Sequence, residues 1–384
     1  MGDFYQIRLE SITAGGQALG RVEGKPVFVD GGAPDETALC RITEDHKTWA
    51  RAELLEIIEA SPVRIAGACP HYGECGGCNL QHIEYNAQLA AKAAILKDSF
   101  CRIAGFSPPE IAVFTGSPWE YRNRMQFHCF RQIAHNSNIN FGLKGRKSGN
   151  ITAVCDCPIA EAGIRELLRQ GGKGISLPPE KDRFNVFYKD GLLLSEGGTE
   201  RGKINFLEKE ILIDAGVFFQ SNISMLEKLI LELRQIAENA DRNLPMADLY
   251  CGVGTFALFL ADLFPGVILA EENKKAVAIA RENLKGINAE FFALRDTDWK
   301  SILSAKPPLG FAVADPPRTG LAAKTAGALA QNGPPTLAYV SCDAAALARD
   351  SKILTAGGYK LNKLSLFDFY PQTAHIESLA IFEK

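Results

Sequence analysis

Ala247-Asp248-Leu249-Tyr250-Cys251-Gly252-Val253-Gly254-Thr255 is the segment most informative about the fold class. Its first four residues resemble the end of a strand, the two glycines predict a turn, and an apolar helix is expected over residues 256–264. Glycines in such a turn let the backbone approach a ligand closely at the carboxyl edge of a parallel sheet. The stretch therefore indicates an open α/β sheet with a ligand site at that edge.

The same rhythm of strand, turn and helix continues over residues 211–384. Val267–Ala270 predicts the next strand, and Glu271 at its end is well placed to accept hydrogen bonds from ribose hydroxyls. The dinucleotide fingerprint needs three spaced glycines, and only G-x-G is present here. By itself the pattern does not separate a nucleoside site from a turn required by packing. We interpret Cys251 as structural.

Two further strand ends carry reactive side chains. One strand runs into Asp315-Pro316-Pro317-Arg318, a rigid turn that can direct polar groups at a flat base. The other runs into Ser341-Cys342, at the edge where a doubly wound sheet places its active site. An isolated cysteine at a strand end is more often buried and structural, so its neighbours decide the interpretation.

The first two thirds of the chain have a different character. Short β-like runs at residues 4–9, 26–29 and 38–42, separated by glycine turns, predict a small β-barrel. A cysteine-rich stretch follows, then a helix over about residues 87–103, in which Leu89, Ala93, Leu96 and Phe100 fall at helical spacing, and a β-rich segment over 121–155. We expect three domains: a barrel at 1–60, a central domain at 61–210 and the α/β domain at 211–384.

Three cysteines lie within ten residues of the central domain. Cys69, Cys75 and Cys78 are close in sequence, and Gly76-Gly77 permits the sharp turn that ligands of one metal need. Cys157, which precedes a proline, could supply a fourth thiolate. Zinc and an iron-sulfur cluster both accept four thiolates, so the spacing leaves the metal open.

Charge is distributed unevenly along a chain whose net charge is -3. Residues 1–60 carry 6 basic and 11 acidic side chains, whereas residues 61–210 carry 19 and 15. Between Trp119 and Asn150 one acid, Glu120, accompanies a basic set interleaved with aromatics: Arg122, Arg124, Arg131, Lys144, Arg146 and Lys147. Basic and aromatic side chains together suit phosphate contacts and stacking on unpaired bases, although a solvated face over a β core would look the same.

Composition restricts the class of protein. The hydrophobic fraction of 46% and charged fraction of 23% are those of globular proteins, and no apolar run approaches the ~18 residues of a membrane span. The first ten residues lack the pattern of a secretory signal. We expect a cytoplasmic monomer that needs no membrane and no obligate protein partner.

Taken together, these motifs resemble those of the RNA uracil-5-methyltransferase family. The resemblance is carried by residues 248–256, 315–321 and 339–342, by Phe218-Phe219-Gln220-Ser221-Asn222, and by His375-Ile376-Glu377-Ser378. The first sixty residues also resemble the TRAM domain of that family, an OB-like RNA-binding barrel. The similarity covers nearly the whole chain.

The resemblance implies a fold, cofactors and roles. The α/β domain would be a Rossmann-like class I methyltransferase domain that binds S-adenosylmethionine, and the cysteines would hold a 4Fe-4S cluster. The implied cofactor residues are Gln220, Tyr250, Gly252, Gly254, Glu271 and Asp315. Cys342 would be the nucleophile and Glu377 the base. Phe218 would face a flipped uracil, and Arg122 and Arg124 would contact RNA, with 23S rRNA favoured over tRNA as the substrate.

Such residues suit the chemistry, because carbon 5 of uracil is too weak a nucleophile to attack a methylsulfonium unaided. Addition of a thiolate at carbon 6 creates an enolate that can attack. The family usually has Asn-Pro after the cysteine, where this chain has Asp343-Ala344. A carboxylate pointing inward there would oppose thiolate formation.

Two other functions compete with this one. An amino-methyltransferase of adenine or cytosine also uses an acidic Pro-Pro turn, but typically follows it with an aromatic residue, and here Arg318 follows. A non-catalytic iron-sulfur RNA-binding protein would also suit the cysteines and the barrel. The presence of Cys342, Glu377 and the glycine turn favours the uracil enzyme over both.

Overall fold

The structure is a computed structural model that describes residues 3–129, 141–146, 149–173, 175, 181–299 and 308–384. It divides into two compact units, each discontinuous in sequence. The first contains residues 1–96, 143–154 and 370–375, and the second contains residues 97–142, 155–369 and 376–384. The domain boundaries at residues 60 and 210 remain a prediction.

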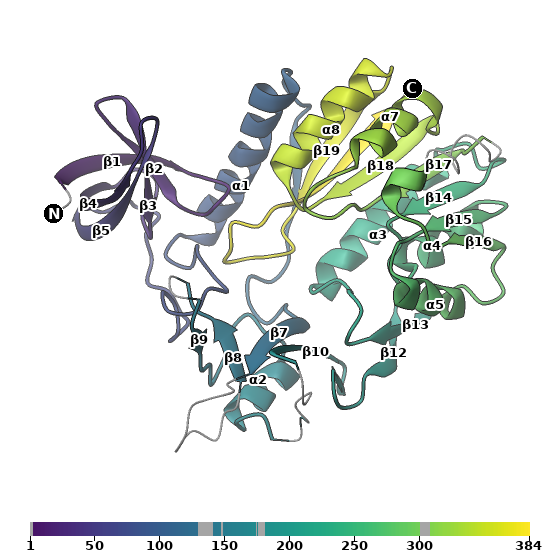
Figure 1. Cartoon of the computed structure of the whole chain (residues 1–384), viewed down its shortest axis with the longest axis horizontal. Coiled ribbons are helices and arrows are strands. Elements are labelled where there is room, and N and C mark those ends of the chain that lie inside the picture. The colour runs from purple at the N-terminus through teal and green to yellow at the C-terminus, as the bar shows by residue number, and fades with distance from the viewer. Residues whose placement is uncertain (1–2, 130–140, 147–148, 174, 176–180, 300–307) are drawn as a thin grey trace. The chain divides into compact units, whose positions relative to one another are not determined.

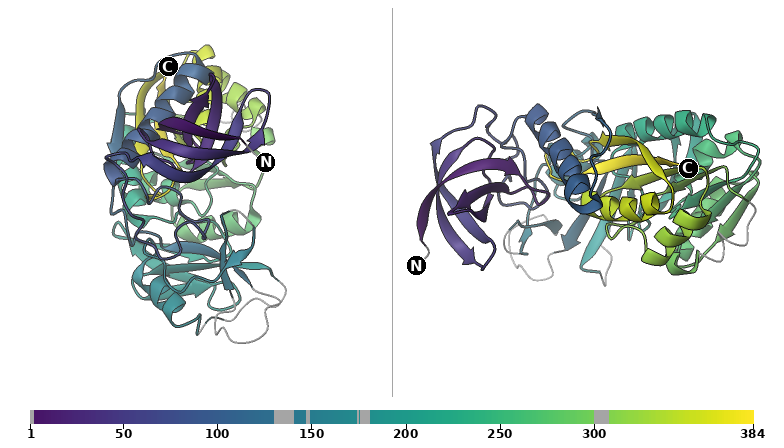
Figure 2. Two further views of the ribbon diagram at one scale, coloured as in Figure 1. Left: turned by 90° about the vertical axis from the view of Figure 1, so that its left-hand side faces the viewer. Right: turned by 90° about the horizontal axis from the view of Figure 1, so that it is seen from above.

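Five strands of the first unit form a closed barrel in the order β1-β2-β3-β5-β4 (Figure 1; Figure 2). The strands are β1 (Phe4–Ile12), β2 (Ala18–Val22), β3 (Lys25–Asp30), β4 (Thr37–Asp45) and β5 (Ala50–Glu59). Alternate residues such as Ile7, Leu9, Val27 and Val29 point inward and are buried, as the period of two in a strand requires. The predicted barrel is confirmed.

Helix α1 (Tyr85–Ser99) begins in the first unit and ends in the second, where the π-helical turn η1 (Phe100–Ala104) continues it. Its buried face carries Gln88, Lys92 and Leu96, two of them polar. The spacing of apolar residues predicted Leu89 and Ala93 on that face, but both are only half-buried. Polar burial of this kind requires hydrogen-bond partners.

An eight-stranded sheet forms the centre of the second unit, in the order β16-β15-β14-β17-β18-β20-β19-β6. The strands are β6 (Ile111–Phe114), β14 (Met246–Leu249), β15 (Val267–Ala270), β16 (Ala289–Phe292), β17 (Phe311–Ala314), β18 (Thr336–Ser341), β19 (Lys360–Phe367) and β20 (Glu377–Glu383). Strands β14 to β18 run parallel, and β20 is antiparallel to both its neighbours. The carboxyl ends of β14, β15, β17 and β18 therefore meet at one edge.

Helices connect these strands, with α7 and α8 drawn beside β18 and β19 in Figure 1. The described helices of the second unit are α2 (Ala162–Arg169), α3 (Ile223–Glu238), α4 (Thr255–Leu260), α5 (Lys274–Asn283), α7 (Ala323–Asn332) and α8 (Ala344–Ala356). Short 3-10 turns are η2 (Ala261–Leu263) and η3 (Asp296–Asp298). No helix within the described ranges has the length and hydropathy needed to span a membrane.

The strands of a smaller sheet lie in sequence between β6 and β14 of the large one. Strand β10 (Arg183–Lys189) pairs with β11 (Leu192–Ser195) and with β7 (Arg124–Cys129), which in turn pairs with the start of β8 (Phe141–Lys144). The end of β8 pairs with β9 (Ile151–Thr152) within the first unit. A hairpin of β12 (Arg201–Phe206) and β13 (Lys209–Asp214) leads into α3.

Candidate active site

The glycine turn follows β14 and begins the candidate cofactor site. Tyr250, Gly252 and Gly254 all have positive φ, at 62°, 54° and 80°. A Cβ on Gly254 would lie 2.5 Å from Leu284 Cδ1, so this glycine is required by packing against the end of α5. A Cβ on Gly252 would meet no heavy atom within 4 Å. Gly252 therefore faces open space at the sheet edge, where a ligand can approach the backbone.

Glu271 follows β15 and lies against the same turn. Its carboxylate accepts a hydrogen bond from Gly252 N at 3.2 Å and another from Asn273 N at 2.7 Å. These two amides fix the carboxylate, which is only half-buried. Two residues assigned to the cofactor from the sequence are thus brought together, with carboxylate oxygens available to ribose hydroxyls.

Two further carboxyls lie at the ends of β14 and β17. Asp248 is fully buried, and its Oδ2 accepts a hydrogen bond from Ala257 N at 2.9 Å, while Oδ1 has no partner among the described residues. Burial, with the nearby charges of Asp315 and Glu271, raises the pKa of Asp248 to about 7. Gln220 Nε2 donates to Asp315 Oδ2 at 3.4 Å, and burial raises the pKa of Asp315 to about 7. This acidic edge suits a cationic ligand, because a positive charge would satisfy carboxyls that now lack one.

Tyr250 is held by a residue that the sequence did not single out. Its hydroxyl donates to Asp296 Oδ2 at 3.1 Å, and its ring makes an edge contact with Trp299, with centroids 4.4 Å apart. Asp296 lies in η3, after β16, so it joins the acidic residues of the same sheet edge. The sequence signal for Asp296 was its place a few residues beyond a strand end. That strand, β16, has only four residues and is hard to recognise from the sequence.

Cys342 and Glu377 lie at one end of the β18–β20 pair. The antiparallel register places Ser341 opposite Ser378, and Ser378 Oγ donates to Ser341 O at 3.2 Å. Cys342 follows Ser341, and Glu377 precedes Ser378. The nucleophile and base predicted from the sequence are therefore neighbours across two paired strands. Glu377 is buried, whereas Cys342 is partly exposed.

Electrostatics hold both groups in their neutral forms. Burial, together with the carboxylates of Glu377 and Asp315, raises the pKa of Cys342 to about 12, and the Arg318 guanidinium opposes them. Burial and the Asp315 charge also raise the pKa of Glu377 well above its usual range, again opposed by Arg318. Arg318 is thus a positive group that acts on both Cys342 and Glu377, favouring the ionised form of each. A cationic ligand beside these carboxyls would shift each pKa downward.

Asp343, the residue where the chain departs from the family pattern, caps helix α8. Its Oδ1 accepts a hydrogen bond from Ala346 N at 2.7 Å. Ser341 Oγ donates to Asp343 O at 3.1 Å, which closes a tight turn around Cys342. The carboxylate is therefore bound at the helix N-terminus, where its negative charge is stabilising.

Phe218 and Arg124 form a platform on which the aromatic ring is exposed. The Phe218 ring is 58% exposed, and the Arg124 guanidinium lies 5.7 Å from its centroid. Arg122 pairs by a backbone bridge with Asn222, and its Nε donates to Arg124 O at 3.2 Å. The structure thus joins the segment of Arg122 and Arg124 to the segment of Phe218 and Gln220. An exposed aromatic ring under a guanidinium suits stacking on a base.

Known proteins were compared with this chain. A family model described as tRNA (Uracil-5-)-methyltransferase matches residues 203–295 and 287–384, and a TRAM domain model matches residues 2–55. An uncharacterized RNA methyltransferase of Treponema denticola is 33% identical, over 94% of this chain and 94% of its own. A 23S rRNA (uracil(1939)-C(5))-methyltransferase of Azoarcus sp. is 30% identical, over 98% of this chain and 99% of its own.

This chain belongs to the RNA uracil-5-methyltransferase family. It is an S-adenosylmethionine-dependent enzyme, as the sequence predicted, and the two competing functions are not supported. The structure of Pyrococcus abyssi tRNA (uracil-54, C5)-methyltransferase in complex with S-adenosyl-L-homocysteine aligns with a TM-score of 0.74, covering 98% of this chain and 100% of that chain at 21% identity. That likeness confirms the fold class, a methyltransferase sheet with an N-terminal TRAM barrel.

The cysteine segment of this methyltransferase is a loop in the first unit. Gly76 N donates to Lys144 O at 2.8 Å, Cys75 forms a backbone bridge with Gly145, and Gly77 N donates to Cys75 Sγ at 3.4 Å. An amide donating to sulfur is a feature of iron-sulfur ligation. Among the described residues, however, no group of three or more His, Cys, Asp or Glu side chains is arranged to hold a metal. Cys157 belongs to the second unit.

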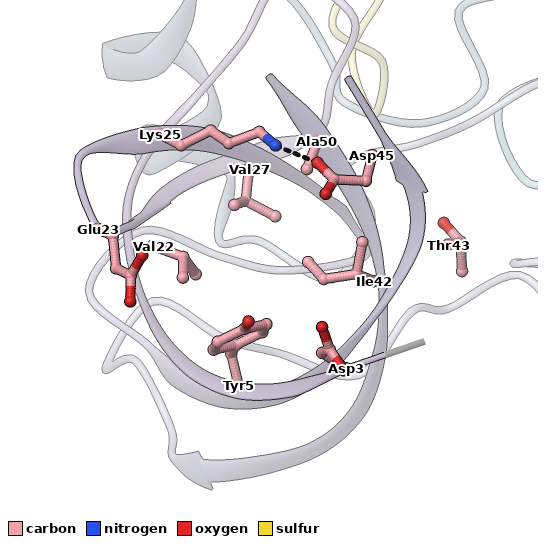
Figure 3. Close-up of a pocket in the computed structure, with 10 residues that line it drawn as sticks. All are labelled: Asp3, Tyr5, Val22, Glu23, Lys25, Val27, Ile42, Thr43, Asp45 and Ala50. Carbon is pink, nitrogen blue, oxygen red and sulfur yellow. Dashed lines mark hydrogen bonds and ion pairs between the residues drawn. The ribbon is translucent and has the colours of Figure 1, made fainter. Parts of the chain in front are cut away.

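In the TRAM barrel, most of the described bases, all but Lys47, are paired with acids. Its arginines and Lys25 each form an ion pair with a carboxylate, as in Arg41 with Glu53 and Arg51 with Glu44. A hollow of about 520 Å³ lies in the barrel. Figure 3 shows Tyr5 and Ile42 among its lining residues, together with the carboxylates of Asp3, Glu23 and Asp45. Such a surface repels phosphate, which agrees with the excess of acids counted in the sequence.

The basic segment predicted to bind RNA is only partly described. Lys144 is exposed at the end of β8, whereas Arg146 is largely buried and lies 3.9 Å from Asp30 in an ion pair. Phe127 and Phe141 are core residues that pack edge-on, so they are not available for stacking. Phe130, Arg131 and Lys147 lie outside the described residues.

Proposed function

We propose that this enzyme methylates carbon 5 of one uridine in 23S rRNA through a covalent bond between Cys342 and carbon 6. Curated relatives that match this chain over nearly their whole length support rRNA, among them those of Azoarcus sp. and Shewanella piezotolerans named for uracil 1939. The observation that carries the mechanism is the Ser341–Ser378 register, because it places Cys342 beside Glu377 at the sheet edge.

The first step belongs to Cys342. Its thiolate adds to carbon 6 of uracil, the π electrons of the carbon 5–carbon 6 bond move toward carbon 5 and oxygen 4, and an enolate results. Cys342 must lose its proton first, although burial and two carboxylates raise its pKa. Arg318 favours the thiolate, and a cationic ligand on the acidic edge adds to that effect.

S-adenosylmethionine, when bound, supplies the methyl group as an electrophile on a positive sulfur. Gly252 would admit its approach to the backbone, and Glu271 would accept hydrogen bonds from its ribose. The unpartnered Oδ1 of Asp248 and the raised pKa values of Asp248 and Asp315 indicate a site built for a positive charge. Gln220 would orient Asp315, and Tyr250 would shape the site together with Asp296.

The last step belongs to Glu377. After methyl transfer, carbon 5 carries both a methyl group and a proton, and its proton must leave as the carbon 5–carbon 6 double bond re-forms. The electron pair of the broken carbon–hydrogen bond restores the double bond and expels the Cys342 thiolate. Glu377 takes this proton in our assignment, which requires its ionised form in the loaded site.

Substrate RNA would contact the platform of Phe218 and Arg124. A uracil rotated out of its helix or loop can stack on the exposed Phe218 ring, and Arg122 and Arg124 can contact phosphate or base. The acidic TRAM barrel would contribute shape contacts or support rather than phosphate binding. We place the enzyme in the cytoplasm, as a monomer.

An iron-sulfur cluster is the second part of the proposal. Cys69, Cys75, Cys78 and Cys157 would supply four thiolates to one 4Fe-4S cluster. Support comes from the sequence spacing, the amide bond to Cys75 Sγ and the family's pattern. No step of the methyl transfer passes through it.

The RNA target can be tested by mapping 5-methyluridine in the 23S rRNA and tRNA of cells with and without this protein. We expect one 23S site to lose its methyl group and tRNA to be unchanged. Loss in the tRNA T-loop with intact 23S rRNA would replace the proposed substrate. Complementation with wild-type enzyme and with Cys342→Ala separates loss of catalysis from loss of the protein.

A further inference from the structure

The segment Tyr370–His375 joins β19 to β20 and ends two residues before Glu377. It belongs to the compact unit of the barrel and the cysteine loop, whereas both flanking strands belong to the other unit. Gln372 and Thr373 are 3% and 2% exposed. A buried connection is unusual, because its backbone polar groups must all find partners within the protein.

The conformation of this segment needs outside support. Gln372 has a φ of 68°, a region that is disfavoured for residues other than glycine. Thr373 contributes some order, because its hydroxyl donates to Tyr370 O at 2.8 Å and accepts from His375 N at 3.2 Å. These bonds close the turn internally but do not fix its place in the unit.

Asn79 supplies the first anchor. Its Oδ1 accepts a hydrogen bond from Ala374 N at 2.8 Å, and its Nδ2 donates to Gly15 O in the barrel at 3.1 Å. Its backbone amide donates to Gln372 O at 3.1 Å. A Cβ on Gly16 would lie 2.2 Å from Asn79 Nδ2, so the barrel turn is shaped for this close approach.

Helix α1 supplies the second anchor through its buried polar face. Gln88 and Gln372 exchange two hydrogen bonds, from Gln88 Nε2 to Gln372 Oε1 and from Gln372 N to Gln88 Oε1, both 3.0 Å. Lys92 is fully buried and donates to Tyr370 O at 3.0 Å. Burying these polar groups is costly unless they form hydrogen bonds. The partners in Tyr370–His375 therefore explain why the buried face of α1 carries Gln88 and Lys92.

We propose that Asn79 and Gln88 are positioning residues for the proton-removal step. They hold Tyr370–His375 in one conformation and thereby fix where the chain enters β20 at Glu377. Asn79 directly follows Cys78, so one loop carries both the cysteines and this anchor of residues 370–375. The inference rests on the proposed role of Glu377 as the base.

The test compares Asn79→Ala with Asn79→Asp. Aspartate retains the oxygen that accepts from Ala374 N and loses only the bond to Gly15, whereas alanine loses both. Asn79→Ala should form the Cys342–RNA adduct on ordinary uridine substrate at nearly the wild-type rate, but release methylated RNA at least tenfold more slowly. Its peptide over residues 370–376 should exchange amide hydrogens at least tenfold faster. Asn79→Asp should resemble wild type in both measurements.

Gln88→Met keeps the side-chain volume but loses the bonds to Gln372 and those to Leu80 O and Ile83 O, and it provides an independent variant if Asn79→Ala is unstable. Normal product release in both variants overturns the proposal, as does an equal slowing of adduct formation and release. Glu377→Gln is measured in parallel. An adduct that accumulates in Glu377→Gln but not in Asn79→Ala overturns the positioning role alone. Absence of adduct in Glu377→Gln overturns the base assignment itself, and the positioning role with it.

Discussion

Ser378 Oγ donates a hydrogen bond to Ser341 O at 3.2 Å, across the antiparallel register of β18 and β20. Both serines are almost fully buried. The bond joins the residue before Cys342 to the residue after Glu377, although 37 positions separate the two serines in sequence. The proposed nucleophile and base are therefore fixed relative to each other by one strand pair.

Replacing Glu377 with glutamine should separate the two halves of the reaction. Adduct formation precedes proton removal, so Glu377→Gln should accumulate a methylated covalent RNA complex that releases little product. A general base contributes typically about 10²–10⁴-fold to rate, so turnover should decrease by a factor in that range. Denaturing gel electrophoresis with labelled RNA measures both species. Turnover near wild type without adduct would require another base.

The reactivity of Cys342 should depend on pH and on the charge of the bound ligand. Its pKa is raised to about 12, so the protonated thiol dominates below that pH, and alkylation should rise about tenfold per unit between pH 7 and 10. Sinefungin, which carries an amine near the position of the sulfonium, should increase the rate at pH 8. S-adenosylhomocysteine, which lacks that charge, should not.

This measurement follows iodoacetamide labelling of the Cys342 peptide by mass spectrometry. Cys101 is exposed and serves as an internal reference, because its labelling rate should be the same with and without either ligand. Equal acceleration by the two ligands would show that ligand charge does not control the thiol.

The proposed iron-sulfur cluster should make protein that is purified under anaerobic conditions brown. Cys75→Ser should lose iron and sulfide, because its thiolate is one of the four proposed ligands. Cys101→Ser, a matched change at an exposed cysteine outside the set, should retain both. Metal and sulfide analysis decides the matter. Stoichiometric zinc without sulfide would replace the cluster with a zinc site.

Lys144 should contribute one phosphate contact. Lys144→Ala should weaken RNA binding and reduce the slope of log affinity against log salt by up to about 1. Lys203, which pairs with Glu210 at 2.9 Å, provides the control, and Lys203→Ala should leave the slope unchanged. An unchanged slope in Lys144→Ala would move the RNA contact elsewhere.

The sequence predicted those parts of the fold that depend on local pattern. Apolar strands ending in Glu271, Asp315 and Cys342 were recognisable because parallel strands carry their functional residues at one edge. The register of Ser341 with Ser378 was not, because β20 inserts between β18 and β19 and pairing of that kind leaves no local signal.

Polar burial was the other feature that the sequence did not predict. The apolar spacing of α1 favoured a face with Leu89, yet the buried face carries Gln88 and Lys92 because their partners lie in residues 370–375. From the sequence, the Asp343 carboxylate was expected to oppose ionisation of Cys342 if it pointed inward. Its role as the cap of α8 can be recognised only in the folded helix. Contacts across 284 or more positions cannot be read from neighbouring residues.

Trapping with RNA that carries 5-fluorouridine at the target position is the decisive test of covalent catalysis by Cys342. Fluorine at carbon 5 cannot leave as a proton does, so the enzyme should stop as a covalent complex after methyl transfer. We predict a denaturation-resistant complex of enzyme and RNA at 1:1, with the crosslinked peptide containing Cys342, and no complex from Cys342→Ala. Absence of a complex from the wild-type enzyme, or a crosslink at another residue, would contradict the assignment of Cys342 as the nucleophile.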